Sequence, residues 1–271
     1  MYLTRHANAD RSRWALDGLY LEENFSLSTL LALPVTETNT YLREAATGER
    51  ATAPLLAPIE PIHEVWAAGV TYLRSREARL VESDTKDIYD KVYEAQRVEL
   101  FFKAIGWRVS GHGESVRIRS DSHWNVPEPE LTLVINRDGE IVGYCAGNDM
   151  SSRDIEGSNP LYLPQAKIYT GSCALGPGIV LAHDSDLADL PIRMEIRRNS
   201  DIIYAGETRT SQMKRPLTAL VDWLGRELSF PQGVFLMTGT GIVPPDAFTL
   251  LAGDTIDIRL ASLVLQNPVT A

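Results

Sequence analysis

The chain has little cysteine and no long apolar segment. Cys145 and Cys173 are the two cysteines among 271 residues, too few for a disulfide framework, so we expect two buried thiols. No run of about 18 apolar residues is present, which argues against a membrane-spanning helix. The first residues contain no apolar core of the kind found in secretory signals. We therefore expect a cytoplasmic protein with no membrane partner.

Positive charge is also scarce. The sequence has 26 Lys and Arg against 36 Asp and Glu, a formal net charge of −10. Phosphate backbones are bound by basic surfaces, so this balance argues against a nucleic-acid partner. No phosphate-binding loop or dinucleotide fingerprint is present, and we expect no nucleotide cofactor. The five histidines lack the spacing of a zinc site, although His112 and His123 flank the acidic motif described next and are open as further ligands.

Two glutamates stand two residues apart where a strand is predicted to begin. Glu128 and Glu130 precede the apolar run of residues 131–135, and side chains at i and i+2 of a strand point to the same face. Two carboxylates on one face repel each other unless a cation joins them. Oxygen ligands of this kind suit Mg²⁺, Mn²⁺ or Ca²⁺. The alternative is that both glutamates are solvated, as acidic residues at a strand start usually are.

A hairpin is predicted after the glutamate pair. Residues 131–135 and 141–145 read as strands, and Asn136-Arg137-Asp138-Gly139 has turn chemistry. The returning strand leads to Asp149 in the segment Gly147-Asn148-Asp149. If the hairpin brings Asp149 back to the same end, three carboxylates would form an all-oxygen metal site.

The remaining pattern is rich in strands and poor in helices. A strand pair is expected around Asp17-Gly18, a short helix over 26–33 capped by Ser26, a hairpin over 192–205, a helix opening at Pro216, and strands over 65–72, 234–238 and 255–260. Such a pattern predicts an α+β protein with a mostly antiparallel core. The proline-rich stretch 54–61 is a candidate linker. We expect a small N-terminal α/β domain over 1–62 and a catalytic domain over 63–271.

These motifs together resemble the fumarylacetoacetate hydrolase superfamily. The resemblance rests on Glu128-x-Glu130-Leu131, on Asn148-Asp149-x-Ser151-x-Arg153-Asp154 and on Lys167, with weaker matches at 69–72, 238–241 and 252–254. It covers about residues 65–262. It implies a rolled, mixed β-sandwich and a Mg²⁺ or Mn²⁺ ion held by Glu128, Glu130 and Asp149. It also suggests a homodimer or homotetramer.

One branch of that superfamily is matched more specifically. Segments 98–104 and 156–167 look like the 2-keto-3-deoxy-pentonate dehydratases, which implies a small 2-oxo sugar acid as substrate and 2-oxoglutarate semialdehyde as product. The superfamily's hydrolases and decarboxylases commonly carry a His–Glu dyad, and Ser75 and Ala78 stand at the matching positions. This departure favours dehydration over the alternatives, an acylpyruvate hydrolase or an oxaloacetate decarboxylase. A binding protein for oxo acids is the non-enzymatic alternative.

Three further residues are assigned roles as hypotheses. Glu99 lies among apolar neighbours that would raise its pKa, and we interpret it as the general base; a buried structural Glu is the alternative. Lys167 is expected to face the oxo acid and offset negative charge, rather than lie on the surface. Thr240, between two glycines, can approach a carboxylate of the substrate, unless the segment is only a glycine-rich turn.

Two neighbouring segments receive structural interpretations. Arg153 and Asp154 are interpreted as an ion pair that braces the loop after Asp149. Residues 73–82 have helical character, and the polar stretch 83–93 is either a cover over the site or a solvated surface segment.

Overall fold

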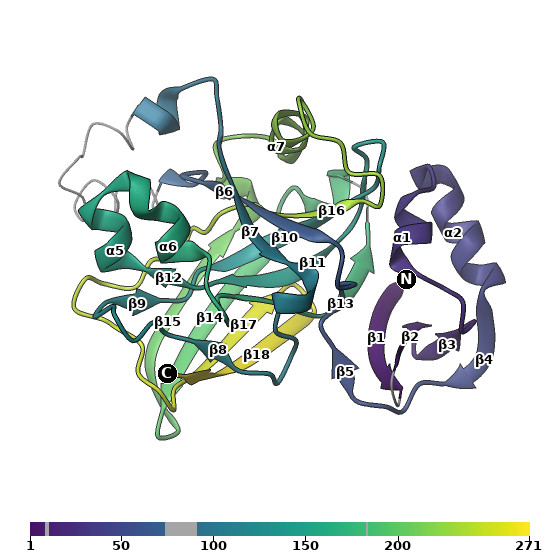
Figure 1. Ribbon diagram of the computed structural model, residues 1–271, viewed down its shortest axis with the longest axis horizontal. Coiled ribbons are helices and arrows are strands. Elements are labelled where there is room, and N and C mark those ends of the chain that lie inside the picture. The colour runs from purple at the N-terminus through teal and green to yellow at the C-terminus, as the bar shows by residue number, and fades with distance from the viewer. Residues whose placement is uncertain (9–10, 74–90, 183) are drawn as a thin grey trace.

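The computed structural model describes residues 1–8, 11–73, 91–182 and 184–271. Strands predominate, and the helices are few and short (Figure 1). The sequence-based expectation of a sheet-rich, mostly antiparallel protein is confirmed, because β16–β6 and β18–β8 are the only parallel pairs among the strands so described.

The larger sheet has eleven strands in the described part of the chain. Its order is β4-β3-β2-β1-β13-β11-β10-β16-β6-β7, and β5 pairs with β1. The strands are β1 (Tyr2–Asn8), β2 (Arg11–Leu16), β3 (Leu19–Leu21), β4 (Ala46–Arg50), β5 (Leu55–Leu56), β6 (Glu64–Gly69), β7 (Glu99–Ile105), β10 (Pro129–Ile135), β11 (Ile141–Asp149), β13 (Cys173–Leu181) and β16 (Val234–Met237).

A second sheet has five strands in the order β15-β14-β17-β18-β8, and β12 and β9 form a separate short pair. Their bounds are β8 (Val116–Arg117), β9 (Asn125–Val126), β12 (Ser151–Ser152), β14 (Pro191–Arg198), β15 (Asp201–Arg209), β17 (Thr255–Leu260) and β18 (Leu263–Thr270).

The helices lie around the sheets. They are α1 (Leu27–Leu31), α2 (Val35–Glu44), α5 (Arg153–Ser158), α6 (Leu163–Lys167) and α7 (Leu217–Leu224), with 3-10 turns at Gly106–Arg108, Pro160–Tyr162, Asp184–Leu187 and Thr210–Gln212. None of those in the described ranges has the length and apolar character that crossing a membrane requires. In Figure 1, α1 and α2 lie at one end of the molecule, and α5 and α6 lie at the other.

The central strand β10 is buried on both faces, which explains its nearly continuous apolar sequence. Leu131, Leu133 and Ile135 point to one face, where they pack with apolar residues of β14, β17, β18 and α7. Val134 points to the other face, where it packs with residues of the N-terminal segment. The strand is therefore held between two apolar clusters, and its polar beginning is rigidly placed.

The N-terminal segment continues the large sheet. β1 pairs with β13 through Tyr2 and Leu3, and side chains such as Trp14 and Leu27 enter the cluster that covers one face of the central strands. The stretch over 54–61, expected to be a linker, contains β5 and pairs with β1. The division of the chain at residue 62 remains a prediction.

Several local predictions are confirmed. Asp17 and Gly18 both have positive φ, 49° and 82°, and connect β2 to β3. Ser26 caps α1 by accepting a hydrogen bond from the Thr29 amide. Pro216 precedes α7, whose Leu217, Leu220, Val221 and Leu224 are buried.

Other predictions differ from the structure or concern residues outside the described ranges. Strand β6 ends at Gly69 rather than near residue 72, because the chain turns there and Tyr72 makes an isolated bridge to Met213. Helix α2 was not predicted, since its turns carry few apolar residues. The helix expected over 73–82 and the cover expected over 83–93 fall largely outside the described residues, as do Ser75 and Ala78.

Truncation of Leu133 tests the two-sheet core. Leu133 is fully buried between the sheets, so Leu133→Ala is expected to lower the free energy of unfolding by about 2–5 kcal/mol, because a cavity remains. Urea unfolding followed by circular dichroism measures the change. Leu161→Ala is the control, because Leu161 is 83% exposed and its truncation should cost no more than about 0.5 kcal/mol. Equal effects of the two changes would contradict this packing.

Candidate metal centre and active site

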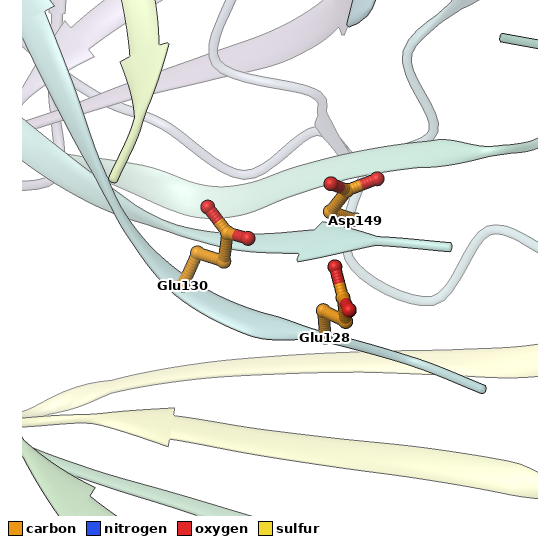
Figure 2. A group of neighbouring side chains, drawn as sticks. All are labelled: Glu128, Glu130 and Asp149. Carbon is orange, nitrogen blue, oxygen red and sulfur yellow. The ribbon is translucent and has the colours of Figure 1, made fainter. Parts of the chain in front are cut away.

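The hairpin β10–β11 brings the three predicted carboxylates together. The backbones of Glu128 and Asp149 pair directly, with N–H···O distances of 3.2 and 2.9 Å. Glu130 follows two residues after Glu128 and pairs with Gly147. Figure 2 shows Glu128 and Glu130 on one strand and Asp149 on the adjacent strand, with the carboxylates grouped together. One oxygen of each lies within 4.8 Å of the others.

The turn that closes this hairpin is the one expected from its sequence. Gly139 has φ 77°, a conformation that glycine adopts without a steric penalty. The Asn136 side-chain oxygen accepts hydrogen bonds from the Asp138 and Glu140 amides at 3.1 and 2.8 Å. The hairpin is longer than predicted, since β11 runs to Asp149 itself, and this extension fixes the position of the third carboxylate.

The three carboxylates are almost completely buried, with exposed fractions of 1–3%. Burial, followed by the nearby Asp149 and Glu128, raises the pKa of Glu130 well above its ordinary range. Grouped carboxylates in such a place are stable as anions only when cations join them. The donor set therefore fits a hard divalent cation such as Mg²⁺.

Cationic side chains surround this group. Lys167, at the end of α6, donates hydrogen bonds to Glu128 and to Asp149 Oδ2, the latter at 2.9 Å. Arg153 Nη2 donates to Glu128 Oε1 at 2.6 Å. Lys103 Nζ lies 2.5 Å from Asp149 Oδ1. The placement of Lys167 against the carboxylates is the one expected of a residue in the site, and its alternative position on the surface is wrong, because Lys167 is 2% exposed.

The expected ion pair between Arg153 and Asp154 is wrong. Arg153 is buried and pairs with Glu128, whereas Asp154 accepts hydrogen bonds from the Ser122 hydroxyl and the His123 amide at 2.6 and 2.7 Å. The two residues begin α5 and point in different directions, which adjacency in the sequence cannot reveal. Arg153 therefore contacts one of the three grouped carboxylates directly.

The other candidate site residues line a single pocket. Glu99 at the start of β7, Lys167 and Thr240 line it together with the three carboxylates. Glu156 of α5 also lines it and is 2% exposed; our sequence reasoning did not single it out, although it belongs to a segment that carried the resemblance.

The pocket depends on close backbone approaches. A Cβ atom on Gly69 would lie 2.1 Å from Glu99 Oε2, so any larger residue where β6 passes that carboxylate would displace it from its present position. The next residue, Val70, has φ 53°, which is rare for a β-branched residue and marks local strain at the site. Gly239 has φ 89°, and its amide donates to Glu130 Oε2 at 2.7 Å. The glycine-rich segment before Thr240 is thus part of the site and not only a turn.

The cysteines and the described histidines are not members of the carboxylate group. Both cysteines are buried and free, as expected, and burial raises the pKa of Cys173 to about 12, which does not suit a nucleophile. Among the described residues, the group of possible metal ligands contains no histidine. His112 Nδ1 accepts a hydrogen bond from the Gln266 amide at 3.2 Å.

The fold and the carboxylate centre agree with one protein family. The profile described as "Fumarylacetoacetate (FAA) hydrolase C-terminal" matches residues 64–270. The chain belongs to this family, as its motifs indicated.

Two relatives define the resemblance more closely. A Haloferax volcanii protein named "Probable 2-keto-3-deoxyxylonate dehydratase" is 45% identical over 242 residues, which cover 89% of this chain and 82% of that protein. The 2-dehydro-3-deoxy-D-arabinonate dehydratase of Saccharolobus solfataricus is 42% identical over 218 residues, 78% of this chain and 73% of the relative.

Two solved structures of dehydratases are similar to this chain over its full length. A hexagonal crystal form of 2-keto-3-deoxyarabinonate dehydratase superposes with a TM-score of 0.87 at 34% identity, covering 100% of this chain and 99% of that one. A structure of 2-keto-3-deoxy-D-arabinonate dehydratase complexed with magnesium and 2,5-dioxopentanoate has a TM-score of 0.85 at 34% identity, with the same coverage.

The raised pKa of Glu130 predicts a linkage between metal binding and protons. Mg²⁺ binds the carboxylate form, so at a pH below the raised pKa of Glu130 binding should release a proton, and it should tighten as the pH rises towards that pKa. Without metal, the folded state holds that proton more tightly than the unfolded state, so stability should fall as the pH rises above the ordinary carboxyl range towards the raised pKa. Added Mg²⁺ at about 100 times its Kd should contribute about 2.7 kcal/mol.

Calorimetry measures this linkage. Mg²⁺ titrations in two buffers with different ionisation enthalpies should give different apparent heats, and EDTA-treated protein should unfold at a lower temperature than the Mg²⁺ form. Calcium-free buffer and a Glu130→Gln variant, which has no proton to release at this position, are the controls. Identical heats in both buffers at every pH tested would contradict a raised pKa of Glu130.

Proposed function

We propose that this chain is a Mg²⁺-dependent dehydratase that converts a 2-keto-3-deoxy-pentonate to 2,5-dioxopentanoate, also called 2-oxoglutarate semialdehyde. The observation that carries the proposal is the joint presence, in one pocket, of three buried carboxylates, Glu99 and Lys167. The relatives that share 42–45% of its residues are named as dehydratases of this substrate class. A similar structure is described with magnesium and this product.

The substrate names of the two relatives are chemically compatible. Xylonate and arabinonate differ at C2 and C3, and both centres are lost when C2 becomes a ketone and C3 a methylene. If both sugars are of the D series, the two names describe one compound with the same configuration at C4. We therefore propose the D form as substrate.

The reaction removes one water. A proton leaves C3, which is acidic because it is adjacent to the 2-oxo group, and hydroxide leaves C4 with a proton from the protein. The C3–C4 double bond so formed is conjugated with the ketone. Transfer of a proton from C5 to C3 then gives an enol across C4 and C5, and transfer of the enol O–H proton to C4 gives the aldehyde at C5. No external oxidant or reductant is needed, because C4 is reduced as C5 is oxidised within the same molecule.

Glu128, Glu130 and Asp149 would hold the Mg²⁺ ion. When bound, the ion acts as a Lewis acid that increases the acidity of the C3 proton. The arrangement in this chain supports that assignment, because the three carboxylates are buried and converge from adjacent strands. Burial, followed by the charges of Asp149 and Glu128, raises the pKa of Glu130.

Glu99 is proposed to accept the C3 proton. It lines the pocket and is half-buried beside Phe101, an environment that favours a basic carboxylate. Gly69 pairs with Glu99 across the two strands, and its lack of a side chain leaves the space that the Glu99 carboxylate occupies.

Lys167 and Thr240 are proposed to bind the substrate. The Lys167 ammonium donates to Glu128, Asp149 and Ser151, and it would exchange one of these hydrogen bonds for one to an anionic oxygen of the substrate and offset charge that develops in the reaction. Thr240 is 3% exposed and lines the same pocket, where its hydroxyl can donate to the substrate carboxylate.

The alternatives are less well supported. The relatives reported above are named as dehydratases, which favours dehydration over acylpyruvate hydrolysis or oxaloacetate decarboxylation. Ser75 and Ala78, the residues expected to replace the His–Glu dyad, lie outside the described residues, so that part of the reasoning rests on sequence.

The organisation of the chain adds further proposals. We propose a small N-terminal domain over 1–62, and over 63–271 a catalytic β-sandwich roll, supported by the apolar cluster shared by the two sheets. A homodimer or homotetramer in the cytoplasm is proposed from the family resemblance and from the two free thiols. Gel filtration with light scattering tests the assembly.

Turnover of 2-keto-3-deoxy-D-pentonate is the direct test of function. Incubation with the protein and Mg²⁺ should produce an aldehyde proton signal and that of its hydrate in the NMR spectrum, and EDTA should abolish both. The L enantiomer serves as the stereochemical control and should react more slowly. Pyruvate and glycolaldehyde as products would show C–C cleavage and contradict dehydration.

Replacement of Glu99 separates turnover from binding. Glu99→Gln is expected to lower kcat by about 10²–10⁴-fold, because the amide cannot accept the proton, and to leave substrate affinity within about threefold. Calorimetric titration and initial rates provide the two measurements. Glu64→Gln is the matched control, since Glu64 lies on the adjacent strand β6 outside the pocket and accepts a hydrogen bond from Trp66. Unchanged turnover in Glu99→Gln would exclude it as the base.

A further inference from the structure

Lys103 is a fully buried lysine on the strand that also carries Glu99. Its exposed fraction is 0%. The pairing of β6 with β7 passes from Val65–Ala104 to Trp66–Phe102, so Lys103 is the extra residue of a β-bulge. Bulges commonly occur beside active sites, where they redirect one side chain. Here the bulge coincides with the residue whose side chain reaches the metal centre.

The Lys103 ammonium has three oxygen neighbours from two other segments. It lies 2.5 Å from Asp149 Oδ1. It donates hydrogen bonds to the Met150 carbonyl at 3.1 Å and to the Lys167 carbonyl. The two carbonyls accept hydrogen bonds from the ammonium, and the contact with Asp149 is an ion pair. Lys103 thereby connects β7, the end of β11 and the end of α6.

These contacts determine how Asp149 is presented. A carboxylate is planar, so holding Oδ1 against Lys103 directs Oδ2 towards Glu128 and Lys167, and Oδ2 lies 2.9 Å from Lys167 Nζ. The hydrogen bond to the Lys167 carbonyl also fixes the backbone from which the proposed substrate-binding lysine extends. Neighbours that orient metal ligands commonly affect metal affinity strongly.

We propose that Lys103 is a positioning residue that orients the metal ligand Asp149 and the backbone of Lys167. This inference rests on the metal-dependent part of the proposed function. It differs from a purely electrostatic role, because a positive charge beside the ligands repels Mg²⁺, and its removal would then strengthen binding. Orientation and repulsion therefore predict opposite changes in metal affinity.

The test is Mn²⁺ binding to Lys103→Met, followed by electron paramagnetic resonance. Methionine has nearly the same length as lysine and lacks the charge and the donors. The Kd for Mn²⁺ is expected to rise about 10–100-fold, and the spectrum of the bound ion should broaden because Asp149 takes several orientations. At saturating metal, kcat should fall, and KM should rise because the backbone that carries the proposed substrate-binding Lys167 is less well fixed.

Two other variants complete the experiment. Lys103→Arg keeps a cation opposite Asp149 and should recover part of the Mn²⁺ affinity. Arg198→Met is the matched control for loss of an ion pair, since Arg198 pairs with the buried Asp254 at 2.7 Å in the second sheet; it should lower thermal stability without changing Mn²⁺ binding. If circular dichroism shows that Lys103→Met does not fold, Lys103→Gln, which keeps two N–H donors without the charge, takes its place.

Two outcomes of the Mn²⁺ experiment would overturn the proposal. Unchanged Mn²⁺ affinity and kcat would reduce Lys103 to a structural residue, and tighter Mn²⁺ binding would show that repulsion is its dominant effect; either result overturns the proposal. Metal binding is measured without substrate. Failure of the dehydratase assignment would therefore appear as absent turnover in the unmodified protein, with the Mn²⁺ comparison still informative.

Discussion

The repulsion among three buried carboxylates is the constraint on which the site depends. Glu128, Glu130 and Asp149 lie in a part of the protein with almost no access to water, where like charges are costly. In the described part of the chain, the carboxylates form ion pairs with cations from three places in the sequence, Lys103, Arg153 and Lys167. The Gly239 amide also donates a hydrogen bond to Glu130. The carboxylate oxygens could also hold a divalent ion. We therefore expect metal binding, stability and protonation to be linked in this one group.

The sheet makes this costly arrangement possible. β10 is packed on both faces by apolar clusters, and the paired backbones of Glu128 and Asp149 leave little freedom at its beginning. Rigid strands hold ligands more accurately than loops do. The groups proposed to act on substrate come from other elements: Glu99 from β7 beside Gly69, Lys167 from α6, and Thr240 from the segment after β16. The same pocket therefore depends on contacts between distant parts of the chain.

Much of the centre was predictable because it is local. The spacing of Glu128 and Glu130 on a strand places them on one face, and the Asn136–Gly139 turn returns Asp149, so one hairpin specifies the carboxylate group. The partners of Arg153, by contrast, could not be predicted, because its nearest acidic neighbour in the sequence points elsewhere. Lys103 and Glu156 lie within segments on which the family resemblance rested, but neither was predicted as a site residue. The burial of Lys103 could not be predicted, because a bulge interrupts the alternation of buried and exposed residues along a strand.

The sequence by itself determined the strand pattern, the main turns, the group of three carboxylates and the family, because each depends on residues close together or on a combination of motifs. Only the tertiary structure decided which cations meet which carboxylates, since Lys103, Arg153 and Lys167 are brought together by strand order and by the bulge in β7. The tertiary structure also decided that β1 joins the large sheet through β13, because pairing between distant strands depends on the packing of whole faces and not on local propensity.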